Sequence, residues 1–212
     1  MPSSIADIRT DYKLQTLNEA DIATNPFQQF TKWWNQAIDS KVLEVNAFTL
    51  ATISKTGKPS ARIVLLKGYD ENGFVFFTNY NSRKSQELIE NPYAAMVFFW
   101  NELERQVRIE GLVEKISHQE SEEYFHSRPI GSQIGAWASP QSTVIPNREI
   151  LEQNEIQYKN QFGENIPKPP HWGGFIVKPI LFEFWQGRSS RLHDRIQYTP
   201  QHNNWKIERL AP

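Results

Sequence analysis

Three cationic or ionisable side chains near the C-terminal end fall at every second position: Arg191, His193 and Arg195. In an extended chain alternate side chains point to one face, so this spacing predicts that all three face the same way. Two guanidiniums and an imidazole repel one another unless an anion lies among them. An exposed basic edge strand is the ordinary explanation. Trp185 and Gln186, just before the cluster, favour a planar, charged ligand instead, because they combine an aromatic wall with polar donors.

A second pair of cations, Arg83 and Lys84, lies in the first turn of a predicted helix that starts at Ser82. Cations there face the positive end of the helix dipole, which costs about 0.3–1 kcal/mol each. A phosphate would reverse this effect, because the free amide groups and both cations would converge on it. Alternatively, both side chains extend into water and pair with Glu87 or Glu90, and the sequence leaves both interpretations open.

Tyr124, Arg128 and Ser132 are spaced by four residues. They share one helical face if the helix continues through the proline that follows Arg128. A phenol, a guanidinium and a hydroxyl make a compact phosphate clamp. Pairing of Arg128 with Glu120 or Glu123 is an equally good explanation.

The segment 62–67 places charges at both ends of an otherwise apolar strand. Arg62 and Lys67 have opposite parity, so a regular strand sends them to opposite faces. A salt bridge or a snorkelling lysine explains this pattern, and so does a strand whose backbone runs along a ligand. Three neutral donors and acceptors could read the edge of a heterocycle, although alone they indicate nothing: Gln106, Gln141 and Ser142.

Other kinds of catalytic site lack candidates in the sequence. There is no cysteine, and no pair of the five histidines has metal-ligand spacing with a carboxylate, so no metal site is expected. No Gly-x-Ser-x-Gly motif is present, which argues against a hydrolytic triad. This leaves chemistry performed by an organic cofactor.

The bulk composition describes an ordinary globular chain of 212 residues. Its 23 basic and 24 acidic residues give a net charge of −1, which argues against a nucleic-acid surface, so anion binding must come from local clusters. No apolar run approaches the roughly 18 residues needed to span a membrane. The N-terminus also lacks the apolar core of a secretory signal, so a cytoplasmic location is expected.

The periodicity predicts a mainly β fold with flanking helices (α+β), best described as an antiparallel barrel. Residues 1–24 lack apolar periodicity and are predicted to form a mobile N-terminal segment, with a single domain over 25–212. A Rossmann fold fits badly, because strands and helices do not alternate. The predicted helices cover about residues 25–38, 82–91, 117–127, 130–138 and 147–162. Asn25 can cap the first of them, and Ser117 with Glu120 forms a capping box for the third. The predicted strands are 47–54, 60–67, 73–78, 93–100, a run around 107–113, 175–185, 192–198 and 205–209.

Six segments together resemble one known family. They are ARIVLLK (61–67), FFTNYNSRK (76–84), SRPIGSQIGAWASPQS (127–142), FEFWQG (182–187), RLHDR (191–195) and the final ERLAP. These segments resemble the pyridoxine (pyridoxamine) 5'-phosphate oxidases, FMN-dependent enzymes of vitamin B6 metabolism. The match extends over nearly the whole chain from about residue 45. It implies an FMN-binding split β-barrel and a homodimer with FMN at the subunit interface.

The resemblance also implies roles for individual residues. Arg191 and His193 would contact the pyridine ring at the catalytic centre, and Arg83 with Lys84 would hold the FMN phosphate. The implied FMN contacts are Arg62, Ile63, Val64, Leu65, Leu66, Lys67, Phe77, Thr78, Arg83, Lys84, Gln106, Gln141, Ser142, Trp185 and Arg195. The implied substrate contacts are Arg9, Tyr12, Lys67, Tyr124, Arg128, Ser132, Arg191 and His193.

The implied activity is oxidation of pyridoxine 5'-phosphate and pyridoxamine 5'-phosphate to pyridoxal 5'-phosphate. Oxygen would accept the electrons and leave as hydrogen peroxide, with ammonia also released from the amine. Two phosphates, one on FMN and one on the substrate, would explain two basic clusters in a chain of near-zero net charge. The alternatives are another split-barrel FMN oxidoreductase and a non-catalytic carrier of FMN or pyridoxal phosphate.

Overall fold

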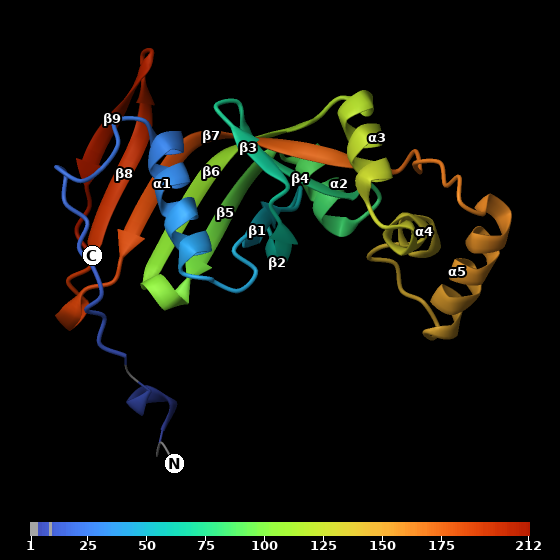
Figure 1. Cartoon of the computed structure of the whole chain (residues 1–212), viewed down its shortest axis with the longest axis horizontal. Coiled ribbons are helices and arrows are strands. Elements are labelled where there is room, and N and C mark those ends of the chain that lie inside the picture. Colours follow the sequence, from blue (N-terminus) through green and yellow to red (C-terminus); the bar gives the residue numbers. More distant parts are fainter. Residues whose placement is uncertain (1–3, 9) are drawn as a thin grey trace. The chain divides into compact units, whose positions relative to one another are not determined.

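The computed structural model describes residues 4–8 and 10–212 (Figure 1). Within them it contains nine strands and five α-helices, which confirms the prediction of a mainly β fold with flanking helices. The strands pair in the order β2-β1-β5-β6-β7-β4-β3, with β8 on β7 and β9 on β8. Their bounds are Ala47–Ile53 (β1), Pro59–Leu65 (β2), Gly68–Asp70 (β3), Gly73–Asn79 (β4), Tyr93–Trp100 (β5), Arg105–Lys115 (β6), Trp172–Gln186 (β7), Asp194–Gln201 (β8) and Asn204–Arg209 (β9).

The α-helices lie close to their predicted positions. Their bounds are Pro26–Asp39 (α1), Arg83–Glu90 (α2), His118–Ser127 (α3), Ile130–Ala138 (α4) and Glu149–Phe162 (α5). No helix of the described residues is long and apolar enough to cross a membrane. The chain divides into two compact units. The first contains residues 4–8, 10–49, 95–110 and 179–212, and the second contains 50–94 and 111–178.

Helix α1 supplies the aromatic core of the first unit. Its N-terminus is capped by Asn25, whose side chain accepts a hydrogen bond from Phe27 N at 2.8 Å. The buried face of the helix packs on β7, where Phe27 meets Phe182 edge to face at 5.2 Å. Trp33 meets Phe184 in the same way at 5.3 Å. Each such ring contributes roughly 1.5–3 kcal/mol through burial, so this packing anchors α1 on the sheet.

The turn that precedes β8 corrects one prediction. Arg191 and His193 do not continue the extended run of Arg195, because β8 begins at Asp194. Arg191 closes a short 3₁₀ turn, Ser189–Arg191, with φ of 60°. Ser190 also has a positive φ of 57°, so the chain reverses here instead of extending. The predicted common face for the three side chains is therefore wrong.

The N-terminal segment makes several contacts within the first unit. Leu17 is buried, and its backbone N–H donates to the Asp194 carboxylate at 3.1 Å. The N–H of Leu14 donates to Glu104 Oε2 at 3.0 Å. The boundary at residue 25 and the mobility of residues 1–24 stay predictions. Residues 1–3 and Arg9 lie outside the described residues.

The second unit combines β4 and the first half of β7 with α2 to α5. Helix α3 begins with the predicted capping box of Ser117 and Glu120. Helices α4 and α5 lie side by side (Figure 1), with the Trp137 ring 5.1 Å from that of Phe162. A buried cluster joins α3, α4 and the segment after α5 to β7 and consists of Phe125, Ile134, Ile166 and Trp172.

Two prolines account for local departures from regular structure. Helix α3 ends at Ser127 and α4 starts at Ile130, which confirms the two separate helices predicted on either side of Pro129. The condition for Tyr124, Arg128 and Ser132 to share one helical face is therefore not met. Arg128 is extended, with φ −78° and ψ 151°, because a residue before proline disfavours helical geometry. Pro179 lies in β7 between its pairing with β4, which ends at Val177, and its pairing with β8, which starts at Phe182. This position suits a residue that cannot donate to the ladder.

Candidate active site

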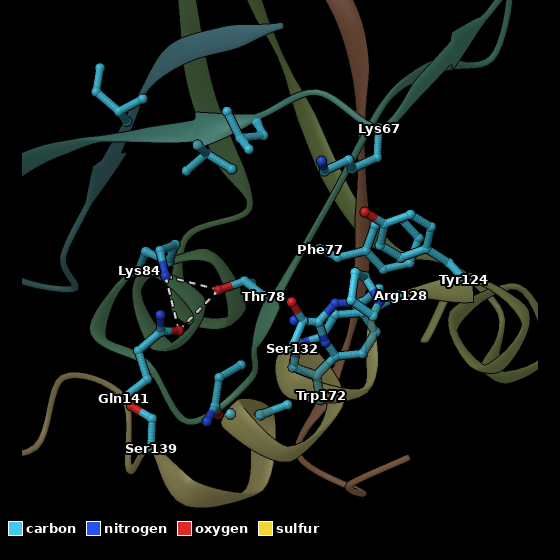
Figure 2. Close-up of a pocket in the computed structure, with 17 residues that line it drawn as sticks. Lys67, Phe77, Thr78, Lys84, Tyr124, Arg128, Ser132, Ser139, Gln141 and Trp172 are labelled. Carbon is cyan, nitrogen blue, oxygen red and sulfur yellow. Dashed lines mark hydrogen bonds between the residues drawn. The ribbon is translucent and has the colours of Figure 1, made fainter. Parts of the chain in front are cut away.

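A cavity of about 610 Å³ lies in the second unit (Figure 2). This volume is in the range of sites for cofactors and small ligands. The lining comes from β2 and the loop after it, β4, the start of α2, helices α3 and α4 with the loop that follows α4, and the start of β7. The lining residues are Ile63, Val64, Leu65, Lys67, Phe77, Thr78, Asn79, Lys84, Tyr124, Arg128, Pro129, Ser132, Gly135, Ala136, Ser139, Gln141 and Trp172.

Lys84 provides a positive charge at one side of this cavity. Its Nζ donates to Thr78 Oγ1 at 2.8 Å, Ser82 Oγ at 3.2 Å and Gln141 Oε1 at 3.3 Å (Figure 2). Burial, together with the positive charge of Arg62, lowers the pKa of Lys84 to about 8. All of these acceptors are neutral. The ammonium group is therefore suited to an anionic ligand, which would supply the missing negative charge.

Arg128 provides a second positive charge, beside aromatic rings. Its guanidinium carbon lies 4.6 Å from the ring centroid of Trp172 and 5.7 Å from that of Phe125. Burial lowers the pKa of this guanidinium. Its Nη1 is buried and has no hydrogen-bond partner in the described part of the chain. A buried donor without an acceptor destabilises the fold, and a ligand that accepts a hydrogen bond from this nitrogen would remove that cost.

Tyr124 and Ser132 line the cavity together with Arg128, so the predicted clamp is assembled although no single helix carries it. Tyr124 stacks on Phe77, with ring centroids 3.9 Å apart, and Phe77 stacks on Trp172 at 5.4 Å. The flat wall next to Arg128 is therefore built from three rings (Figure 2). Sequence reasoning missed Trp172, because an aromatic residue after a proline-rich connector carries no signal of a pocket.

The regular strand through Lys67 on which the parity prediction rested does not form, because β2 ends at Leu65. Lys67, just after the strand, lines the cavity with Ile63, Val64 and Leu65. Leu66 is buried, with 4% of its surface exposed. Arg62 does not line the cavity and instead contacts Glu87, so for this residue the salt bridge is observed.

The family resemblance also assigned Arg83 and Ser142 to FMN, but these two residues follow or precede lining residues in the sequence without lining the cavity themselves. Arg83 is exposed and pairs with Glu87, its Nε lying 2.8 Å from Oε1, as the alternative explanation proposed. Ser142 is exposed with φ of 70°, one residue beyond Gln141. Neither of them lines the cavity.

The remaining implied site residues belong to the first unit, apart from Arg9, which is not described. Trp185 and His193 have ring centroids 4.6 Å apart, and Tyr12 lies edge-on to both. Gln106 lies in β6 of the same unit. His193 Nδ1 accepts a hydrogen bond from Arg188 N at 3.1 Å. In the neutral ring the proton is thus assigned to Nε2.

Carboxylates provide the anions that the basic C-terminal cluster requires. Glu183 is nearly buried and forms a two-point ion pair with Arg195, with distances of 2.9 and 3.0 Å. Asp194 pairs with Arg188 at 2.8 Å, which gives Arg188 a structural role. Arg195 and Arg188 are therefore compensated, whereas Arg191 is exposed.

Arg191 is expected to keep His193 neutral. Burial lowers the pKa of His193 first, the positive charge of Arg191 lowers it further, and Asp194 opposes both effects. We expect Arg191→Ala to raise the pKa of His193, measured from the pH dependence of its imidazole NMR signals. Arg148→Ala, which removes an exposed arginine of the second unit, is the matched control. An unchanged titration in Arg191→Ala would show that the two side chains do not interact.

Comparison with known proteins identifies the family. Residues 35–161 match the sequence profile described as pyridoxamine 5'-phosphate oxidase. Residues 172–212 match the pyridoxine 5'-phosphate oxidase C-terminal dimerisation region. The chain belongs to the pyridoxamine 5'-phosphate oxidase family. It is 57% identical over 211 residues to pyridoxine/pyridoxamine 5'-phosphate oxidase 1 of Ralstonia nicotianae, covering 99% of this chain and 100% of that one. Its identity to the pyridoxine/pyridoxamine 5'-phosphate oxidase of Burkholderia mallei is also 57%, over 213 residues, with the same coverage.

Solved structures confirm the split-barrel fold of this oxidase family. PhzG from Burkholderia lata, in complex with tetrahydrophenazine-1-carboxylic acid, superposes with a TM-score of 0.88 at 29% identity. That match covers 94% of this chain and 99% of PhzG. A pyridoxamine 5'-phosphate oxidase-related, FMN-binding protein from Nostoc punctiforme has a TM-score of 0.71 at 17% identity, covering 90% of this chain and 100% of that one.

Proposed function

We propose that this protein oxidises pyridoxine 5'-phosphate and pyridoxamine 5'-phosphate to pyridoxal 5'-phosphate. The observation that carries the proposal is one cavity with two partly buried positive groups, Lys84 and Arg128, which lack carboxylate partners among their described contacts. Figure 2 shows them on different sides of the cavity, with aromatic rings next to Arg128. A site for two phosphate groups, one on the cofactor and one on the substrate, needs such an arrangement.

FMN is the cofactor of the chain, as the sequence predicted. The donors at Lys84, Thr78 and Gln141 fit its phosphate, because they present an ammonium without a carboxylate partner beside neutral hydrogen-bonding groups. When bound, FMN supplies a hydride acceptor that oxygen can reoxidise. Lys84 and Arg83 would hold the cofactor phosphate at the start of α2, where free amide groups add to the attraction.

The substrate would be held by its phosphate and by its ring. In this proposal Arg128, Tyr124, Ser132 and Lys67 bind the phosphate, and the stacked wall beside them excludes water. The two protons and two electrons removed from an alcohol reduce O2 to H2O2. The amine substrate additionally consumes one water and releases ammonia. The residues of the chain position the reacting carbon, and they form no covalent intermediate with the substrate.

The residues of the first unit are proposed to complete the site in a homodimer. Arg191 and His193 would contact the substrate ring, and Trp185 with Arg195 and Gln106 would contact FMN. Residues 172–212 match the dimerisation region of the family, which supports a two-chain assembly. The cytoplasmic location stays a prediction of the sequence.

A second candidate is another split-barrel FMN oxidoreductase, which the likeness to PhzG keeps open. The buried Nη1 of Arg128, beside Tyr124 and Ser132, favours a phosphorylated substrate. Activity on pyridoxine 5'-phosphate but not on dephosphorylated pyridoxine would favour the proposed oxidase. A non-catalytic carrier would bind both ligands without producing peroxide.

The visible spectrum of the purified protein tests the proposal directly. We expect flavin absorbance that bleaches when pyridoxine 5'-phosphate is added without oxygen and returns when air is admitted. A buffer addition without substrate is the control. Absorbance that stays unchanged with substrate would reject the proposed substrate. A protein that cannot be loaded with FMN would overturn the cofactor as well.

A further inference from the structure

We infer that Glu87 is a positioning residue that orients the arginines beside the cofactor phosphate. This inference rests on the proposed function, because it assumes that the phosphate of FMN binds at the start of α2. Glu87 lies on α2, and only 5% of its side chain is exposed. None of the sequence motifs assigned it a role toward a ligand.

The carboxylate of Glu87 joins three elements of the second unit. Its Oε2 accepts hydrogen bonds from Thr52 Oγ1 of β1 at 2.5 Å and from Ser60 Oγ of β2 at 2.6 Å. Arg62 Nη2 of β2 lies 3.4 Å from the same oxygen. Arg83 Nε, on the same helix, lies 2.8 Å from Oε1. Both carboxylate oxygens are therefore occupied, each by a different set of donors.

These contacts keep Glu87 ionised although it is buried. Burial alone would raise its pKa, but hydrogen bonds from Ser60, Thr52 and Arg83 lower the pKa to about 2. A buried carboxylate is costly to leave unpaired, so a fold retains one where it organises charged partners. Here the partners are two of the cations that the family resemblance assigned to FMN.

The net charge of Glu87 and the three cations around it matches the charge of a phosphate group. Arg62, Arg83 and Lys84 carry three positive charges, and Glu87 cancels one of them, which leaves two. A phosphate monoester carries about −1.5 to −2 charges at neutral pH. Without Glu87 the three cations repel one another, and Arg62 already acts electrostatically on Lys84.

Glu87 fixes the arginines without using all of their donors. Among the described hydrogen bonds, Arg83 engages Glu87 only through Nε, so its two terminal nitrogens stay available to a ligand. Arg62 is held by Thr52 Oγ1 and Ser60 Oγ, each at 2.5 Å, which are the same hydroxyls that bind Glu87. Side chains fixed in advance lose less conformational entropy when the phosphate binds.

The test compares FMN with riboflavin, which has the same ring system but no phosphate. We expect Glu87→Gln to weaken FMN binding to the apoprotein by about tenfold, the loss that one charge-assisted contact produces. Riboflavin affinity should change by less than about twofold. Both dissociation constants are measured from the quenching of flavin fluorescence at pH 7.5. Glu90→Gln removes an exposed charge from the same helix and is the matched control.

A double-mutant cycle separates positioning from a general structural effect. If Glu87 acts through Arg83, Glu87→Gln should cost less in an Arg83→Ala background than in the native chain. Ser60→Ala keeps the carboxylate but removes one hydrogen bond to each partner, so it should show the same phosphate-specific loss to a smaller extent. It also keeps the inference testable if Glu87→Gln does not fold.

The outcomes are distinguishable. A native apoprotein that does not bind FMN would overturn the proposed function together with this inference. Native-like FMN affinity in Glu87→Gln would overturn the inference alone. Equal losses for FMN and riboflavin, or additive losses in the cycle, would also overturn it, because they indicate a structural effect on the whole pocket.

Discussion

Arg128→Ala is expected to raise KM for pyridoxine 5'-phosphate by roughly 100-fold, the effect of removing one partner of a buried charge pair. The guanidinium of Arg128 is held against the Trp172 ring, and its buried Nη1 lacks a protein partner among the described residues. A substrate phosphate would satisfy this nitrogen, and alanine offers neither the charge nor the donors. Because Lys84 lies on another side of the cavity, FMN affinity should change little (Figure 2).

Steady-state kinetics with native and variant enzyme, both fully loaded with FMN, measure this effect. Arg148→Ala is the control, since Arg148 is 85% exposed and pairs only with Glu152 among the described ion pairs. Arg128→Lys should give an intermediate KM, because lysine keeps the charge but loses the planar fork and its stacking on Trp172. A native KM in Arg128→Ala would show that the substrate phosphate binds elsewhere.

Local chemistry predicted the parts of the fold that depend on neighbours in sequence. The Asn25 cap and the capping box of Ser117 and Glu120 were correct, because each involves residues within a few positions. The pairing of Arg83 with Glu87 was weighed for the same reason, since residues four apart are neighbours on a helix.

The turn before β8 was not predicted, because it depends on contacts between segments that are far apart in the sequence. The turn at Ser190 is accompanied by two such contacts, from Gly187 N to Glu104 O and from Ser189 Oγ to Tyr12 O. No spacing rule contains these pairs, and the cluster around Arg191 was therefore expected to be extended.

The candidate site was predicted better than its supporting elements. Tyr124, Arg128 and Ser132 were expected to share a helical face only if the helix continued through Pro129. The helix is broken there, and the three side chains nevertheless line one cavity. Their residue types point to phosphate whatever backbone carries them. In contrast, the position of Trp172 beside Arg128 and the contacts of Glu87 with β1 and β2 depend on packing of segments 25 residues or more apart.

Lys84→Met is expected to weaken FMN binding by about 100-fold at pH 7.5, because it removes the ammonium group from the proposed phosphate site. Methionine keeps the apolar stem of the side chain, so the apoprotein should fold normally. Riboflavin affinity should stay near its native value, because riboflavin has no phosphate. Lys159→Met, which replaces an exposed lysine on α5, is the control. Native FMN affinity in Lys84→Met would exclude Lys84 from the phosphate site.

The pH dependence of FMN binding provides an independent test of Lys84. In the apoprotein the pKa of this lysine is lowered to about 8 by burial and by Arg62, so it loses its charge above that pH. A bound phosphate favours the ammonium form and raises the pKa again, so binding takes up a proton. FMN affinity of the native apoprotein should therefore fall between pH 8 and 9.5, by at most about tenfold per pH unit. The second ionisation of the phosphate, near pH 6, lies below this window and does not contribute. In Lys84→Met the affinity should be nearly independent of pH over the same range, and a slope equal to that of the native protein would assign the titration to another group.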